Sequence, residues 1–86
     1  MKSFQYVITD EVGIHARPAG LLAKKAKEFT ATITITNKDG KSAEAKKLMA
    51  VMSLGVKKGE TVTVSVDGEN EDAAFAEIQA FFSENL

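Results

Sequence analysis

Residues 13–20 read Gly-Ile-His-Ala-Arg-Pro-Ala-Gly, and this stretch holds the only histidine and the only proline of the 86-residue chain. Proline lacks an amide hydrogen and has a fixed φ near the helical value, so it fits the first turn of a helix and disrupts its interior. Pro18 therefore predicts a helix that begins at about Ala16. Gly13 allows a sharp turn just before that helix, which places His15 at or beside its N-cap.

The start of a helix is a favourable place for an anion. Its first amides have no acceptor within the helix, and the helix dipole adds partial positive charge there. Arg17 adds a guanidinium group, whose geometry suits phosphate oxygens. The pattern predicts that the ring of His15 carries a phosphoryl group. A histidine beside a helix start is more often an ordinary capping or surface residue, so the spacing alone leaves both interpretations open.

A basic stripe runs along the predicted helix away from His15. Steps of three and four residues align its members on one face, and they are Arg17, Gly20, Lys24 and Lys27. Most charged stripes are solvated faces, so this one does not identify a partner site by itself.

Length and composition limit the class of protein. Eighty-six residues suit a single domain with a modest core. The absence of cysteine and the single histidine exclude a disulfide framework and the usual thiolate or histidine metal clusters, so no cofactor is expected. No apolar run is long enough to cross a bilayer, and the first residues lack the apolar stretch of a signal peptide. We therefore expect a cytoplasmic protein.

Four short segments alternate between apolar and polar residues, as half-buried strands do. They lie at about residues 4–8, 32–36, 41–44 and 61–66, with a hairpin turn at Asn37–Gly40. Helical patterns cover residues 16 to about 27 and the segment after Asn70, which is expected to cap the last helix. With one more helix described next, the order is β-α-β-β-α-β-α. This order predicts an α+β fold, an open-faced sandwich with a four-stranded, mostly antiparallel sheet and three helices on one face, in the split β-α-β arrangement.

Residues 46–55 read Lys-Lys-Leu-Met-Ala-Val-Met-Ser-Leu-Gly and predict a short helix of about two turns that stops at Gly55. Its apolar residues, Leu48–Met52, cover nearly the whole circumference, and one sheet cannot bury them all. The helix is therefore either sunk in the core or leaves apolar surface for a partner. In so small a domain we favour the second interpretation.

Residues 13–19 resemble the active-site signature of the HPr family, the histidine-containing phosphocarriers of the sugar phosphotransferase system. Residues 48–55 resemble the second signature of that family, and the order of elements matches over the whole chain, 1–86. The resemblance implies that Nδ1 of His15 accepts a phosphoryl group from the phosphohistidine of enzyme I. It further implies transfer to a histidine on the A component of a sugar permease, with Arg17 and the backbone amides of Ala16 and Arg17 holding the phosphate.

The resemblance also implies that partners dock on the first two helices. The residues of that surface would be Gly20, Leu21, Lys24, Lys27, Leu48, Met49, Ala50 and Met52. The chain would act as a monomeric carrier rather than an independent enzyme, without membrane insertion and without binding nucleic acid. In Gram-positive members a regulatory serine precedes the second helix, and Lys47 takes that position here, so serine-switch control is not expected.

Two other functions remain open at this point. A regulatory module could use the same surface without carrying phosphate. An RNA-binding domain of similar element order would need aromatic residues on its central strands, whereas those strands carry isoleucine and valine on one side and mostly threonine on the other.

Overall fold

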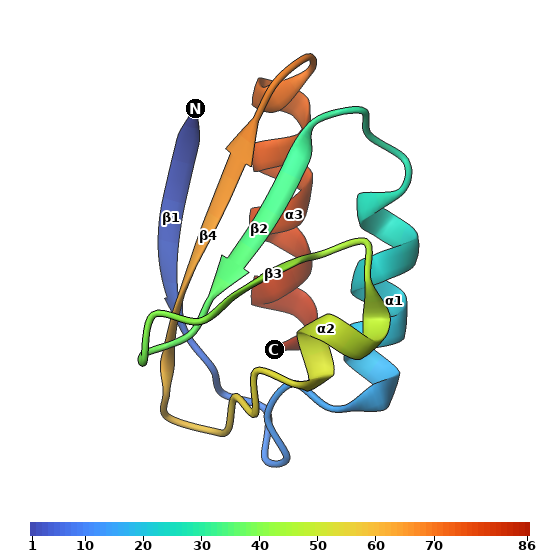
Figure 1. Ribbon diagram of the computed structural model, residues 1–86. Coiled ribbons are helices and arrows are strands. Elements are labelled where there is room, and N and C mark those ends of the chain that lie inside the picture. Colours follow the sequence, from blue (N-terminus) through green and yellow to red (C-terminus); the bar gives the residue numbers. More distant parts are fainter.

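The computed structural model describes residues 1–86 and contains seven elements in the predicted order. They are β1 (Lys2–Val7), α1 (Ala16–Ala26), β2 (Thr32–Thr36), β3 (Ser42–Glu44), α2 (Leu48–Met52), β4 (Thr61–Asp67) and α3 (Glu71–Asn85). Figure 1 shows α1 and α3 side by side on one face of the sheet, with α2 beside α1 and near β3. The predicted open-faced α+β sandwich is confirmed. None of these helices is both long enough and apolar enough to span a bilayer.

The sheet has the strand order β1-β4-β2-β3, and all three pairings are antiparallel. The last strand in the sequence, β4, therefore lies between β1 and β2, as the split β-α-β arrangement predicts. The short strand β3 lies at an edge, also as predicted. Because the end of β1 pairs with the start of β4, with Val7 opposite Thr61, the loops that follow β1 and precede β4 lie at the same end of the sheet.

The inner face of the sheet packs against the helices because its residues alternate in the predicted register. The five inward side chains of the two central strands are at most 1% exposed, namely Ile33, Ile35, Val62, Val64 and Val66. They belong to one cluster of 20 buried residues that also takes in the apolar stripes of α1 and α3. Phe82 of α3 is the largest fully buried side chain. The opposite face of the sheet is open and carries mainly serine and threonine.

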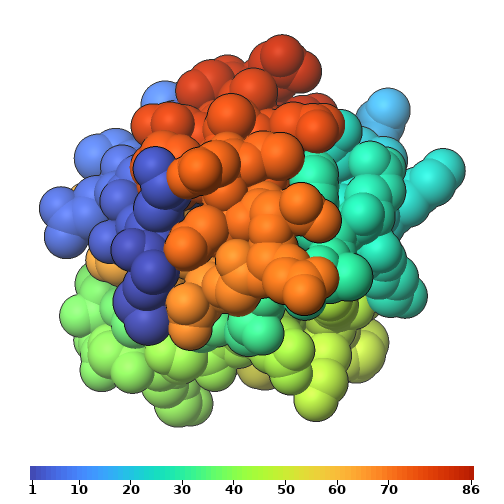
Figure 2. All heavy atoms as spheres, turned by 90° about the horizontal axis from the view of Figure 1, so that it is seen from above, coloured from blue at the N-terminus to red at the C-terminus, as the bar shows by residue number.

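Figure 2 shows the end of the molecule at which β1 begins and β4 ends. The N-terminus lies there beside the turn between β4 and α3. The Met1 amino group lies 3.0 Å from a carboxylate oxygen of Glu71, and its hydrogen bond with Glu71 raises the pKa of that amino group. Asn70 occupies the N-cap position, but the prediction that its side chain caps α3 is wrong. Asn70 has a φ of 60° and makes no side-chain cap hydrogen bond, because a capping side chain needs extended backbone to reach the first amides.

The second helix is shorter than predicted. It has five residues, Leu48–Met52, which is about one and a half turns rather than two. Val51 is buried, whereas Leu48 and Met49 are 37% and 75% exposed. The prediction that this segment leaves apolar surface in solvent is confirmed.

Glu60 joins the loop before β4 to the turn between β2 and β3. One carboxylate oxygen accepts a hydrogen bond of 2.9 Å from the Lys57 amide, and the other lies 2.9 Å from Nζ of Lys38. The hydrogen bond with Lys38 is the largest of the effects that hold the pKa of Glu60 below its ordinary value of 4.5. Glu60 thus holds the backbone at Lys57 in place. The neighbouring residue, Val56, supports the loop of the candidate site described below.

This pair predicts a pH-dependent loss of stability in Glu60→Gln. Because folding lowers the pKa of Glu60, its charge stabilises the fold above the ordinary carboxyl pKa, and this contribution disappears as the pH falls through the folded-state pKa. Glu60→Gln should therefore unfold at lower urea concentration than the wild-type chain near neutral pH, and the difference should shrink as the pH falls through the folded-state pKa of Glu60.

Glu69→Gln is the matched control, since Glu69 is exposed and forms no ion pair within 4.0 Å. Equal urea midpoints for the two variants at neutral pH would contradict this role of Glu60.

Candidate active site

The first helix begins immediately after His15, as Pro18 predicts. His15 is the N-cap residue, with extended backbone (φ −111°, ψ −173°), and its carbonyl accepts a 2.9 Å hydrogen bond from the amide of Ala19. Its side chain makes no capping hydrogen bond. The amides of Ala16 and Arg17 have no acceptor in the helix and find none in the loop before it. These two N–H groups remain available to an anion at the helix start.

The loop before α1 is anchored on the segment that precedes β4. The amide of Ile14 donates a 3.0 Å hydrogen bond to the carbonyl of Val56, and Ile14 is buried. Gly13 has a φ of 85°, and a Cβ on it would lie 2.6 Å from Cα of Lys57 and overlap the carbonyl oxygen of Val56. Only glycine fits this close approach of two backbones. The position of His15 is therefore set by packing as well as by the helix start.

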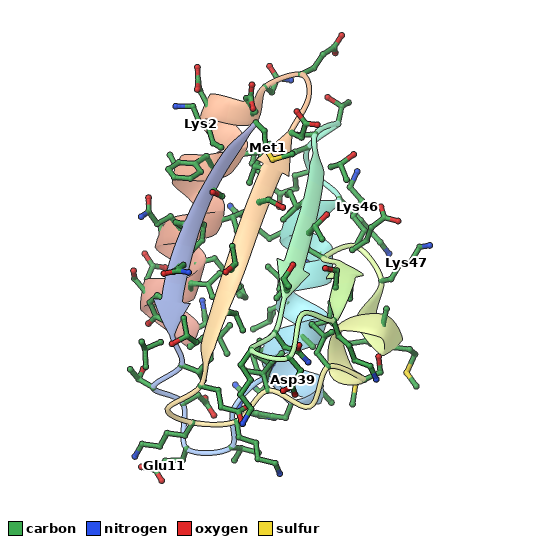
Figure 3. The ribbon with its side chains drawn as sticks, turned by 60° about the vertical axis from the view of Figure 1, so that its left-hand side comes forward. Met1, Lys2, Glu11, Asp39, Lys46 and Lys47 are labelled. Atoms are coloured by element: carbon green, nitrogen blue, oxygen red, sulfur yellow. The ribbon has the colours of Figure 1, made fainter.

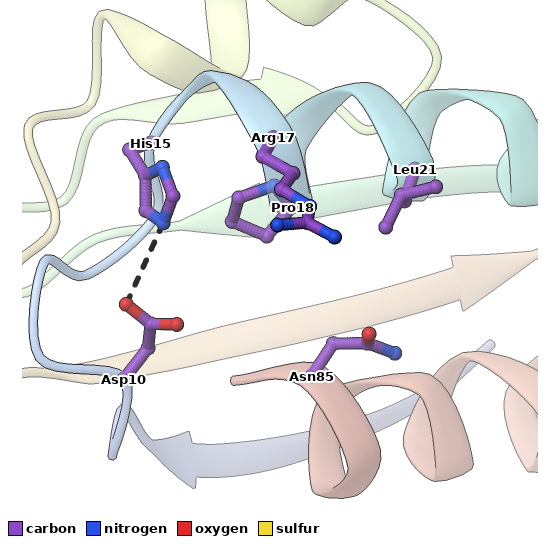
Figure 4. Close-up of a pocket in the computed structure, with 6 residues that line it drawn as sticks. All are labelled: Asp10, His15, Arg17, Pro18, Leu21 and Asn85. Atoms are coloured by element: carbon purple, nitrogen blue, oxygen red, sulfur yellow. Dashed lines mark ion pairs between the residues drawn. The ribbon is translucent and has the colours of Figure 1, made fainter.

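A pocket opens beside His15 between the start of α1 and the end of α3. It is lined by Asp10, His15, Arg17, Pro18, Leu21 and Asn85. Figure 4 shows the residues of α1 along one side of this pocket, with Asp10 and Asn85 facing them from the other. Arg17 thus lines the same pocket as His15, and its role in holding a phosphate stays a prediction.

The ring of His15 is accessible but not free of contacts. Its side chain is 37% exposed, and Nε2 lies 3.6 Å from Oδ1 of Asp10, a pair marked by the dashed line in Figure 4. Nδ1 is left without an ion-pair partner. A partly exposed imidazole at a helix start, on the same pocket as a guanidinium group, can accept a phosphoryl group whose oxygens the helix amides and the guanidinium bind.

Seven of the eight predicted docking residues lie in α1 and α2, which contact each other, and the eighth, Lys27, is the C-cap residue of α1. Three of them are exposed apolar side chains, with Leu21 46%, Leu48 37% and Met49 75% exposed, and the side chains of Lys24 and Lys27 are exposed as well. The remaining predicted members, Gly20, Ala50 and Met52, are half-buried. The fold therefore brings all eight residues to neighbouring helices, although their contact with a partner stays a prediction.

Two lysines precede α2. Lys47 is its N-cap residue, without a side-chain cap, and Nζ lies 3.5 Å from a carboxylate oxygen of Glu44. Figure 3 shows Lys46 and Lys47 together at this edge of the molecule. Lys47 is exposed and carries a positive charge.

Sequence reasoning missed two residues of the pocket. They are Asp10, in the loop before α1, and Asn85, at the end of α3. The spacing of Asp10, five residues before the histidine, was a weak signal, because many loops carry an aspartate. Nothing in the sequence indicates that the end of α3 lies beside the start of α1.

The family model described as "PTS HPr component phosphorylation site" matches residues 2–84. The chain belongs to the HPr family. The phosphocarrier protein HPr of Mycoplasma genitalium is 40% identical over 85 residues, which cover 99% of this chain and 97% of the relative. HPr of Lysinibacillus sphaericus is 39% identical over 84 residues, covering 98% of this chain and 94% of the relative.

Solved HPr-type structures share the fold. A histidine-containing phosphocarrier protein, described with the divergence of Mycoplasma from Gram-positive bacteria, has a TM-score of 0.92 at 38% identity and covers 96% of this chain and 93% of its own. Crh of Bacillus subtilis, described as a domain-swapped dimer, has a TM-score of 0.77 at 36% identity, with 94% and 92% covered. The chain is thus an HPr-type phosphocarrier of the phosphotransferase system, and the family inferred from its two signatures is confirmed.

The contact at Gly13 predicts a large effect of one added methyl group. Gly13→Ala must hold alanine at positive φ, which costs about 1 to 3 kcal/mol, and must also separate the loop from Val56. Gly40→Ala is a matched control, because Gly40 has a φ of 87° and nothing within 4 Å of a built Cβ. Urea unfolding should show a greater loss of stability for Gly13→Ala than for Gly40→Ala. Equal losses would show that the approach to Val56 does not constrain the loop.

Proposed function

We propose that Nδ1 of His15 accepts the phosphoryl group from the phosphohistidine of enzyme I and passes it to a histidine of the A component of a sugar permease. The observation that carries this proposal is the placement of a half-exposed histidine ring at the start of α1, on the same pocket as Arg17. The resemblance of residues 13–19 to the family signature supports the same assignment.

The chemistry needs positioning and charge stabilisation more than further functional groups. The lone pair of Nδ1 attacks phosphorus, the N–P bond forms, and the bond to the donor nitrogen breaks with its electron pair left on the donor. The amides of Ala16 and Arg17 and the Arg17 guanidinium bind the phosphoryl oxygens. Transfer to the acceptor reverses these steps, so the chain is consumed and regenerated as a carrier and is not an independent catalyst.

The surface on α1 and α2 would dock both partners. It combines exposed apolar side chains with exposed lysines, and this combination fits an acidic partner with an apolar centre. The open face of the sheet carries serine and threonine rather than aromatic side chains, which does not favour RNA binding. We propose that the chain works in the cytoplasm as one domain, residues 1–86, and as a monomer, although the described Crh relative is a dimer.

Control by serine phosphorylation is not part of this proposal. Lys47 takes the position at which Gram-positive members of the family carry the regulatory serine, and lysine cannot accept that modification. Ser53 lies beyond the other end of α2 and donates a 2.7 Å hydrogen bond to the carbonyl of Ala50. It does not replace the missing hydroxyl.

The central test is phosphorylation of the purified chain. Incubation with phosphoenolpyruvate, magnesium and enzyme I should add one acid-labile phosphate, and His15→Ala should abolish the label. Intact-protein mass spectrometry and acid lability measure both results. A phosphate that persists in His15→Ala would reject the assignment. If a partner still binds His15→Ala with full affinity while no phosphate is transferred to the wild-type chain, a regulatory binding module is the better interpretation.

The docking surface predicts that an acidic side chain at its most exposed apolar position weakens partner binding. Met49→Glu should raise the Kd for enzyme I roughly tenfold, because it removes an apolar contact and places a carboxylate opposite an acidic partner. Val7→Glu is the matched control, since Val7 is 52% exposed but lies on β1 with its side chain on the open face of the sheet. Calorimetric titration measures the Kd of both variants for enzyme I. An equal change in the two Kd values would exclude the surface on α1 and α2 as the docking site.

A further inference from the structure

We propose that Asp10 is a positioning residue for His15. Its carboxylate keeps the ring proton on Nε2 and so leaves the lone pair of Nδ1 free for the phosphoryl group. This inference rests on the proposed function of His15 and assigns a role to a residue that the sequence signature does not include.

The carboxylate of Asp10 is held in place by the backbone around it. Oδ1 accepts a 2.9 Å hydrogen bond from the amide of Val12, and the Asp10 carbonyl accepts one of 3.0 Å from Gly13. The Asp10 amide donates a 3.0 Å hydrogen bond to the main-chain oxygen of the last residue, Leu86. The side chain is only 28% exposed. Asp10 is therefore fixed to the same turn that Gly13 anchors against Val56.

The carboxylate faces one particular nitrogen of the ring. Oδ1 lies 3.6 Å from Nε2 of His15, and no lysine or arginine lies within ion-pair distance of Asp10. The other charged group that lines this pocket is Arg17, and Asn85 is neutral. The distance exceeds that of a hydrogen bond by a few tenths of an ångström, and such contacts in unliganded sites often shorten when the reacting group binds.

The position of the proton decides whether His15 can react. A neutral imidazole has one N–H, and an acceptor beside one nitrogen favours the tautomer with the proton there. With the proton on Nε2, the lone pair of Nδ1 attacks phosphorus directly. The positive charge that develops on the phosphorylated ring is shared with Nε2–H, next to the carboxylate. When the N–P bond breaks, its electron pair returns to Nδ1 and the proton stays on Nε2, so neither transfer requires a proton to move.

The same geometry separates two negative groups. The two ring nitrogens point away from each other, so a carboxylate beside Nε2 lies on the far side of the ring from a phosphoryl group on Nδ1. The phosphoryl oxygens meet the amides of α1 and Arg17, whereas the carboxylate meets the ring N–H. Asp10 can therefore stabilise the ring without occupying the position of the phosphoryl group.

The test compares Asp10→Asn and Asp10→Ala with Glu11→Gln. The control removes the same charge from the next residue, whose 85% exposed carboxylate pairs with Lys58 instead, 2.9 Å away; Figure 3 shows Glu11 at the tip of this loop. Asp10→Asn retains an acceptor for the Val12 amide, so it preserves the turn if Asp10→Ala does not fold.

Nitrogen-15 NMR of the ring measures the tautomer, and because the chain has one histidine, its signals need no assignment. Single-turnover transfer from phosphorylated enzyme I measures the rate.

We expect the share of the Nδ1–H tautomer to rise several-fold in Asp10→Ala and to rise less in Asp10→Asn, whose neutral amide oxygen is a weaker acceptor. Transfer to His15 should slow roughly five- to tenfold, the effect of losing a charge-assisted contact at a half-exposed site, while Glu11→Gln stays at the wild-type values. An unchanged tautomer, or an unchanged rate despite a changed tautomer, would overturn the role of Asp10. Neither result would affect the assignment of His15, which depends on the label in His15→Ala, and the NMR measurement needs no phosphate at all.

Discussion

The start of α1 immediately after His15 is the constraint on which the site depends. It has two independent causes, which are the proline in the first turn and the contact of Gly13 with the backbone of Val56 and Lys57. Because the proline starts the helix at Ala16, the first two helix amides are unpaired beside the ring. The contact of Gly13 fixes the loop that places the ring next to these amides.

The topology of the sheet explains why distant segments meet at this point. Placing β4 between β1 and β2 brings the loop after β1 beside the loop before β4. The amides of Thr9 and Asp10 both donate to the carbonyl of Leu86, so the end of α3 is held against the same loop. Three parts of the chain, near residues 10, 56 and 86, thus form one support for a single side chain.

Most of the fold could be predicted because its elements have strong local patterns. Thr32–Thr36 alternates perfectly, and Pro18 fixes one helix boundary to the residue. The length of α2 could not be predicted, because Gly55 marks the end of the turn after α2 and not the end of the helix itself. The left-handed backbone of Asn70 could not be predicted either, because asparagine at a helix start usually has an extended backbone. In the site, His15 and Arg17 follow from their helix, whereas the contact of Asp10 depends on how the loop closes on itself and on Leu86.

The central claim is that phosphate is carried on Nδ1 of His15, between the ring and the amides of α1. The most direct measurement is the one-bond coupling between nitrogen-15 and phosphorus-31 in the phosphorylated chain, labelled at its single histidine. The proposed function predicts a coupling to Nδ1, with new downfield shifts of the Ala16 and Arg17 amide protons. A coupling to Nε2, the nitrogen that faces Asp10, or no coupling to either ring nitrogen, would contradict it.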